Sequence, residues 1–242
     1  MTVKTGGLAG IVAGDSAIAT VGQDGVGLSY RGYSIDELAQ HASFEEVAYL
    51  LIYGQLPSPE ALTEYTAELV RLRYLPNALA ACLEQLPKSA NPMDVLRTTC
   101  SILGSLEPES SAHDQVAITN RLIALFPGAL LYWYHFSYFN QRIDISSTTE
   151  STAAYFLELL QQKKPDPLQV KVLNISLILY AEHEFNASTF AARVTSATCS
   201  DIYSAMCSAI GTLRGPLHGG ANEEALKLIQ QFATPEAAQE GI

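Results

Sequence analysis

The sequence predicts an all-α, multi-helical fold with a small β-hairpin near the N-terminus. From residue 34 onwards, capping residues followed by a proline or an acidic residue recur, and these are the usual signals for the start of a helix. The β-prone runs that flank a turn lie before residue 34. Hydrophobic residues make up 48% of the 242-residue chain, which is enough to build a buried core.

The first expected elements are the hairpin and two short helices. Residues 17–30 contain two β-prone runs separated by Asp24-Gly25, which is a common hairpin turn. Two S-x-x-E capping boxes follow, and they predict helices that begin after Ser34 and Ser43. Gly54 stands where the second of these helices should end.

Five longer helical segments follow, most of them marked by a cap or a proline at one end. Pro127 should kink the third of them or divide it in two, because proline removes a backbone donor and clashes with the preceding turn. The fifth is apolar almost all round, which is typical of a helix buried in the interior. The expected ranges are 58–74, 91–106, 115–142, 151–162 and 168–180.

A stripe of small residues runs through the next helical segment, residues 189–213. Such a stripe lets another helix approach closely along its length. The partner is either a helix of the same core or the same helix of a symmetry-related subunit, since two-fold interfaces pair identical surfaces. The stripe recurs at every fourth position and comprises Ala192, Ser196, Ser200, Ser204, Ser208 and Thr212.

Two histidines are the candidate functional residues. His218 lies in a glycine-rich turn before a helix that should begin at about Ala221, and the nearby helix N-terminus should favour a neutral imidazole. Glycines on both sides leave the backbone open to a ligand. His183 and Asn186 would share a helix face if the preceding helix extends that far. The alternatives are a surface histidine in an ordinary turn for His218, and a buried histidine bonded to a neighbour for His183.

The charge and the cysteine pattern argue against several classes of function. The net charge is −11 and the 14 Lys and Arg residues form no basic run, so we expect neither nucleic acid nor an anionic membrane as a partner. The four cysteines show no CxxC spacing, and no basic segment precedes an apolar core at the N-terminus, which predicts a cytoplasmic protein with free thiols. The most apolar run, residues 124–134, is too short to span a membrane.

Several stretches resemble the citrate synthase family, in the same order along nearly the whole chain. They are GPLHGGAN at 215–222, AEHEFNAST at 181–189, YRGYSI at 30–35, FEEVAYLL at 44–51 and PMDVLRT at 92–98. The resemblance implies a homodimer that condenses acetyl-CoA with oxaloacetate to give citrate and CoA, a reaction of the tricarboxylic acid cycle. It implies no metal and no redox cofactor.

The resemblance also implies roles for the candidate residues. His218 corresponds to the family histidine that hydrogen-bonds the thioester carbonyl oxygen and stabilises the enolate. His183 corresponds to a histidine that contacts oxaloacetate, and Asn186 is its substrate-binding neighbour. The stripe-bearing segment corresponds to a helix at the family's dimer interface.

Other parts of the family's catalytic set do not occur after His218. Removal of a methyl proton needs a carboxylate base opposite a donor for the enolate oxygen. The family supplies an aspartate base, a second histidine in a G-x-x-H-R motif and arginines for the substrate carboxylates, and residues 219–242 contain no Asp, His or Arg. We therefore expect 1–220 to form the N-terminal part of the large helical domain and 221–242 to begin the small domain.

On these grounds the chain alone is expected to lack condensing activity. Two alternatives to an acetyl-CoA enzyme stay open. The first is a 2-methylcitrate synthase, which uses propionyl-CoA and which the residues present do not distinguish. The second is a non-catalytic fragment that serves dimerisation or assembly.

Overall fold

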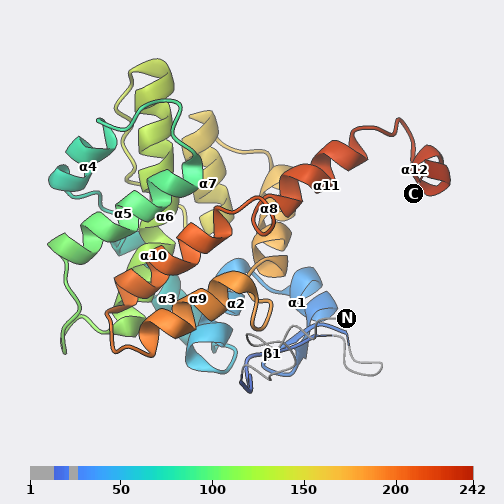
Figure 1. Ribbon diagram of the computed structural model, residues 1–242, viewed down its shortest axis with the longest axis horizontal. Helices are drawn as coiled ribbons and strands as arrows, with labels where there is room; N and C mark the ends of the chain where they lie inside the picture. Colours follow the sequence, from blue (N-terminus) through green and yellow to red (C-terminus); the bar gives the residue numbers. More distant parts are fainter. Residues whose placement is uncertain (1–13, 22–26, 242) are drawn as a thin grey trace, which may run out of the picture.

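The computed structural model describes residues 14–21 and 27–241 and shows the predicted, predominantly helical fold (Figure 1). Most helices pack into one body, from which the last two project. The helices are α1 (Ile35–His41), α2 (Phe44–Tyr53), α3 (Pro59–Arg71), α4 (Asn77–Leu83), α5 (Pro92–Leu106), α6 (Gln115–Phe139), α7 (Thr152–Gln161), α8 (Pro167–Leu179), α9 (Ala187–Ser196), α10 (Ile202–Leu213), α11 (Ala221–Ile229) and α12 (Pro235–Gly241).

The small β element is a three-stranded antiparallel sheet. Strands β1 (Ala19–Thr20) and β2 (Ser29–Tyr30) pair as the predicted hairpin, whose turn, residues 22–26, lies outside the described residues. The strand β3 (Tyr33–Ser34) was not predicted. It follows a two-residue turn in which Arg31 and Gly32 both have positive φ, of 49° and 88°. Such turns usually carry Asn-Gly or Asp-Gly, so Arg-Gly gave a weak signal.

Local capping chemistry sets most of the predicted helix ends. Ser43 and Glu46 form the complete capping box at the start of α2, and Gly54 ends that helix with φ of 86°. Ser58 caps α3 as expected. The predicted capping box at Ser34 is wrong in part, because its side chain accepts a hydrogen bond from the Asp36 backbone and none from Glu37.

Helix α4 was missed because it has no local start signal. Pro76 stands at its N-cap and makes no side-chain capping bond. Two of its leucines, Leu79 and Leu83, are fully buried in the main hydrophobic cluster against α5 and α6. Burial of these two side chains therefore stabilises a helix whose N-terminus carries no capping signal.

The central helix α6 runs without interruption through Pro127, so the proline does not divide it. By length and composition alone α6 could cross a membrane, but 61% of its most apolar stretch is buried within the protein. It packs against α3, α4, α5 and α7, and it buries the polar side chains of Asn120, Arg121 and His135. Core helices of globular proteins pass the same test of length and composition.

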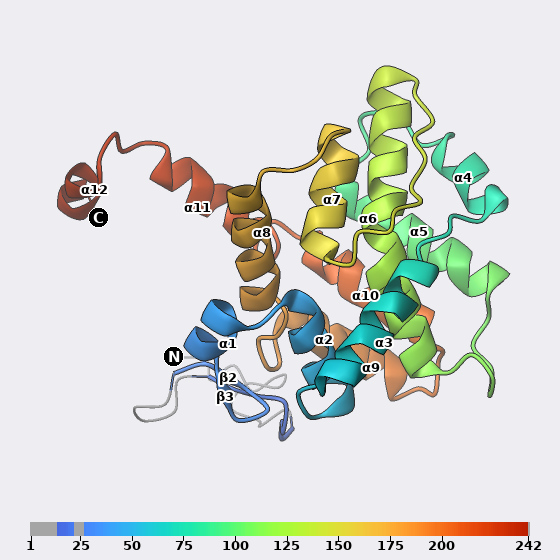
Figure 2. The same ribbon diagram turned by 180° about the vertical axis from the view of Figure 1, so that it is seen from behind.

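Helix α8 is far more exposed than its apolar sequence predicted. Only Ile178 is buried, whereas Leu168 is 68% exposed and Val172 57% exposed. The helix lies against α1, α2 and α7 with one side only (Figure 2). Asn174 fixes its position, because its side-chain oxygen accepts a hydrogen bond from the Phe44 backbone at 2.9 Å. The expectation of an interior helix is therefore wrong for the described chain.

The segment with the small-residue stripe is a pair of helices rather than one. The chain turns between α9 and α10 at residues 197–201, where Cys199 adopts φ of 61° and Asp201 caps α10. The two helices pack side by side, and Thr195 Oγ1 donates to Ser208 Oγ at 2.8 Å. Small side chains thus serve close packing within one chain, as the first of the two interpretations expected. The second interpretation, packing between subunits, stays a prediction.

Candidate functional site

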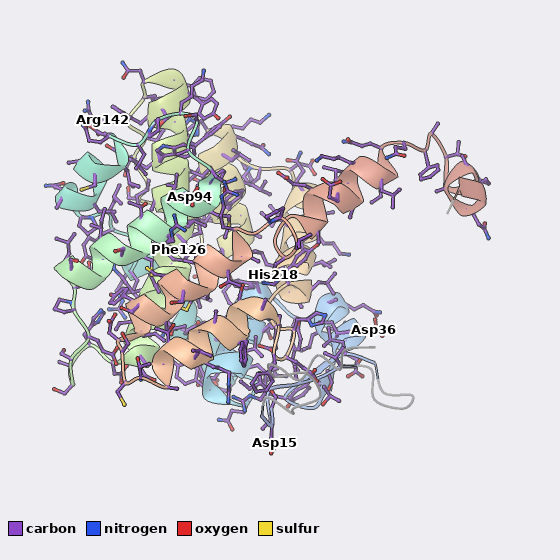
Figure 3. All side chains as sticks on the ribbon, in the orientation of Figure 1. Asp15, Asp36, Asp94, Phe126, Arg142 and His218 are labelled. Atoms are coloured by element: carbon purple, nitrogen blue, oxygen red, sulfur yellow. The ribbon has the colours of Figure 1, made fainter. Side chains whose placement is uncertain are left out.

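The turn that carries His218 joins α10 to α11 (Figure 3). The Nε2 atom of the half-buried His218 lies 2.7 Å from Oγ of Ser188, which is in the first turn of α9. The backbone N–H of His218 donates to the carbonyl of Gly215 at 3.0 Å. Two segments that are 30 residues apart in the sequence therefore meet at this imidazole.

The glycines of this turn are required by the backbone of the turn itself. A Cβ atom on Gly219 would lie 2.0 Å from the carbonyl oxygen of Leu213. A Cβ atom on Gly220 would lie 2.5 Å from the carbonyl oxygen of Pro216. Neither oxygen belongs to a flexible side chain that could move aside, so only glycine fits at both positions. Their function is to let the chain fold back so that His218 can reach Ser188.

Helix α11 begins at Ala221, as predicted, and carries Glu223 and Glu224 in its first turn. No side chain caps its N-terminus. The positive end of the helix dipole therefore lies three residues after His218. The apolar side chains Leu226 and Ile229 are 55% and 67% exposed, because α11 projects from the body of the molecule.

His183 is exposed and lies in the connection between α8 and α9. Helix α8 ends at Leu179, so the expectation that His183 and Asn186 share a helix face is wrong. The turn includes Glu184 with φ of 49°. The Asn186 backbone N–H donates to the carbonyl of His183 at 3.2 Å, which keeps the two residues adjacent by a different geometry.

Asn186 is the N-cap of α9. Its side-chain oxygen accepts hydrogen bonds from the backbone N–H groups of Ser188 and Thr189 at 3.0 and 3.1 Å. Its side-chain NH₂ donates to Thr189 Oγ1 at 3.0 Å. Asn186 thus positions the helix turn from which Ser188 reaches His218. Its predicted contact with a substrate stays a prediction.

Tyr30 is a residue of this region that the sequence reasoning did not identify as functional. Its side chain is fully buried, and its hydroxyl lies 3.1 Å from the carbonyl oxygens of both Ile178 and Glu182. The same hydroxyl accepts from the Glu182 backbone N–H at 3.4 Å. Burial raises the pKa of Tyr30, so it stays a neutral donor. The small sheet therefore holds the connection that presents His183.

Two carboxylates, Glu182 and Glu184, lie in the connection between α8 and α9. Glu184 Oε1 accepts a hydrogen bond from the Val21 backbone at 3.1 Å, which ties the connection to the residue after β1 as well as to Tyr30 of β2. Burial raises the pKa of Glu182. Within residues 14–21 and 27–241, no group of three or more His, Cys, Asp or Glu side chains is arranged to hold a metal ion.

We expect Tyr30→Phe to lower the free energy of unfolding by about 1–3 kcal/mol, because buried backbone groups lose a polar partner. Chemical denaturation measures this loss. Tyr33→Phe is the matched control, since Tyr33 is 40% exposed and its hydroxyl makes no bond within the described part of the chain. Equal losses in the two variants would contradict the anchoring role of Tyr30.

The protein is predominantly helical. Its glycine-rich turn with His218 contacts the first turn of α9, and the connection that precedes α9 contains His183. The family model described as "Citrate synthase, C-terminal domain" matches residues 7–242. A 2-methylcitrate synthase from Shewanella oneidensis is 54% identical over 226 residues, which cover 93% of this chain. A citrate synthase from Synechocystis is 40% identical over 234 residues, which cover 95%. The chain belongs to the citrate synthase family.

Solved structures agree with this assignment. The citrate synthase of Thermotoga maritima superposes with a TM-score of 0.81 at 32% identity, covering 97% of this chain and 62% of that one. A ternary complex of carboxymethyl coenzyme A and oxaloacetate with the Thermoplasma acidophilum citrate synthase gives 0.83 at 26% identity, covering 96% and 61%. The chain spans 60% of the Shewanella relative and 58% of the Synechocystis relative.

Proposed function

We propose that this chain supplies part of the active site of an enzyme that condenses an acyl-CoA with oxaloacetate. The observation that carries the proposal is the bond between His218 Nε2 and Ser188 Oγ at the helix N-terminus of α11. This bond holds the Nε2 edge of the imidazole in place, in a turn where Gly219 and Gly220 cannot be replaced by a larger residue. The Thermoplasma neighbour, solved with a CoA derivative and oxaloacetate, supports the class of substrate.

The direction of the bond between Ser188 and His218 determines which ring nitrogen of His218 can donate to a substrate. If the Ser188 hydroxyl donates to Nε2, the imidazole is neutral and carries its hydrogen on Nδ1. Nδ1–H then has no partner among the described residues, and it can hydrogen-bond a thioester oxygen as negative charge develops there. A neutral donor placed in advance stabilises the enolate without having to reorganise during the reaction. We propose that His183, on the connection held by Tyr30, binds oxaloacetate.

The acyl donor is either acetyl-CoA or propionyl-CoA. The Shewanella relative is named a 2-methylcitrate synthase and the Synechocystis relative a citrate synthase, so both reactions occur among similar proteins. We propose citrate synthesis from acetyl-CoA, with 2-methylcitrate synthesis as the alternative. The ratio of kcat/KM for the two thioesters in an active preparation decides between them.

We expect residues 1–242 alone to release no CoA from acetyl-CoA and oxaloacetate above the uncatalysed rate. Addition of a citrate synthase family segment that carries the G-x-x-H-R motif, the aspartate and the arginines should restore turnover. The exposed apolar side chains of α8 and α11 offer a surface for that segment. CoA release is followed with a thiol reagent. Turnover by the 242-residue polypeptide alone would contradict this expectation.

The competing function is an assembly module that dimerises and performs no chemistry. The family resemblance is the reason to expect a homodimer, and the α9–α10 contacts lie within one chain. Sedimentation at several concentrations measures dimerisation independently of the CoA assay. Dimerisation with no rescue by the complementing segment would favour the assembly function over the enzyme.

A further inference from the structure

Helices α5 and α10 pack as a close antiparallel pair, and a cysteine of each lies at their contact. In successive contacts between them, the residue numbers rise along α5 and fall along α10, so the two helices run in opposite directions. Arg214 Nε bonds Asp94 at 3.2 Å, Cys207 Sγ lies 3.6 Å from the Arg97 carbonyl, and Cys100 Sγ lies 3.5 Å from the Tyr203 carbonyl. Each thiol thus faces a carbonyl of the opposite helix, which places the two cysteines next to each other at the contact.

Glycines one turn beyond each cysteine bring the two backbones together. A Cβ atom on Gly104 would lie 2.9 Å from the Cβ atom of Tyr203. Gly211 lies against Arg97 in the same way, with the Arg97 side chain 3.6 Å from its ideal Cβ position. A disulfide requires Cβ atoms about 3.5–4.5 Å apart. The two glycines let the helices pack closely on either side of the cysteine pair.

The two thiols differ in access and in reactivity. Cys100 is fully buried, whereas Cys207 is partly exposed. The neighbouring Cys100 thiol lowers the pKa of Cys207, whereas the Cys207 thiol and burial raise the pKa of Cys100. The thiolate is the nucleophile in thiol oxidation. Cys207 is therefore the sulfur that a small oxidant reaches and reacts with first.

We propose that Cys100 and Cys207 form a redox-active dithiol that hydrogen peroxide converts to an intrachain disulfide between α5 and α10. The Cys207 thiolate attacks one peroxide oxygen to give a sulfenic acid and releases hydroxide, which takes up a proton to become water. The Cys100 sulfur then attacks the sulfenic sulfur, the S–S bond forms, and the Cys100 proton leaves with the hydroxyl group as water. Two thiols are oxidised and one peroxide is reduced to two waters.

The site lies on the helix that leads into the His218 turn. α10 ends at Leu213, and the turn with His218 begins two residues later. A disulfide would fix α10 covalently to α5, whereas the reduced pair is held by packing, by the thiol–carbonyl contacts and by the exposed Asp94–Arg214 ion pair. This modification site is independent of the proposed condensing activity, because its formation is read from the chain itself.

The test is peptide mapping after brief treatment of the folded 242-residue protein with hydrogen peroxide. Trypsin would leave Cys199 and Cys207 in one peptide, 194–214, so the assay uses a Cys199→Ser variant. We expect a link between peptides 98–121 and 194–214, an intact mass lower by two hydrogen atoms, and full reversal by dithiothreitol. Cys82, exposed on α4, is the internal control and should stay unlinked.

A second variant keeps the test decisive. Cys207→Ser changes the partly exposed member of the pair and should abolish the link while leaving Cys100 unreacted. Cys100→Ser should instead leave a sulfenic acid on Cys207 that dimedone traps. Oxidation of Cys207 to sulfinic acid in the otherwise native pair, with Cys100 still a free thiol, would overturn the proposal. A link to Cys82 would overturn it as well.

Discussion

Arg121→Met is expected to lower the free energy of unfolding by about 3–5 kcal/mol, because it leaves a largely buried carboxylate and two carbonyl oxygens without their partner. The Arg121 side chain is 1% exposed and its Nε and Nη2 each donate to Glu107 at 2.9 Å. Nη1 donates to the carbonyls of Leu72 and Tyr74, the latter at 2.9 Å. The guanidinium also lies 4.1 Å from the centre of the Tyr74 ring. Thermal or chemical unfolding measures the loss.

Arg142→Met is the matched control for burial. Arg142 also binds a carboxylate through two nitrogens, with both distances to Glu84 at 2.7 Å, but its side chain is 67% exposed. Ion pairs in water contribute little, since solvent screens them and two side chains lose freedom. We therefore expect a much smaller loss for Arg142→Met. Similar losses in the two variants would show that burial is not what makes the Arg121 pair important.

The same pair should make stability depend on pH. Burial alone would raise the pKa of Glu107, but hydrogen bonds from Arg121 and Tyr74 lower it below its ordinary value of 4.5. A carboxylate with a lowered pKa stabilises the fold above its ordinary pKa, and the contribution is lost as the pH falls through the folded-state value. The difference in stability between wild type and Arg121→Met should therefore shrink below pH 4.5.

His218→Ala is expected to lower kcat/KM for CoA release by the complemented protein about 100- to 1,000-fold, which is the usual effect of removing one donor to a developing oxyanion. The change removes Nδ1–H and leaves the glycine turn in place. Ser188→Ala keeps the imidazole and frees its orientation and tautomer, so the expected loss is about tenfold. Both effects should fall on kcat, because the enolate exists after the substrate has bound.

A control on the same helix separates chemistry from folding. Thr195→Ala removes a hydroxyl of α9 that bonds Ser208 and has no contact with His218 among the described hydrogen bonds. It should leave kcat within about twofold of wild type, since surface and peripheral substitutions seldom change a site at this distance along a helix. A loss as large as that of Ser188→Ala would mean that the site responds to the packing of α9 in general.

Sequence reasoning predicted the parts of this fold that neighbouring residues determine. The capped starts of α2, α3 and α5 and the glycine end of α2 follow from bonds within one turn of helix. The missed helix α4, the exposure of α8 and the break between α9 and α10 depend on packing between distant segments. Periodicity alone could not show that the six small residues of the stripe divide between two helices.

The candidate site divides in the same way. The turn with His218 and the start of α11 could be predicted because glycines and acidic residues mark them in the sequence. The partners of these residues could not, since Ser188 and Tyr30 lie 30 and about 150 residues from the groups that they bind. Asn186 was identified by its motif as a substrate-binding residue. In the structure its side chain caps α9, and an Asn just before the helical sequence Ala-Ser-Thr is itself a capping signal.

The most direct test of the account is the rate of CoA release by the wild-type chain mixed with the complementing family segment, compared with the His218→Ala chain in the same mixture. Circular dichroism and sedimentation first establish that both chains are folded to the same extent. The account predicts turnover in the wild-type mixture and at least about a 100-fold lower rate in the variant mixture. Equal turnover in the two mixtures would contradict the assignment of the His218 turn to the condensing site.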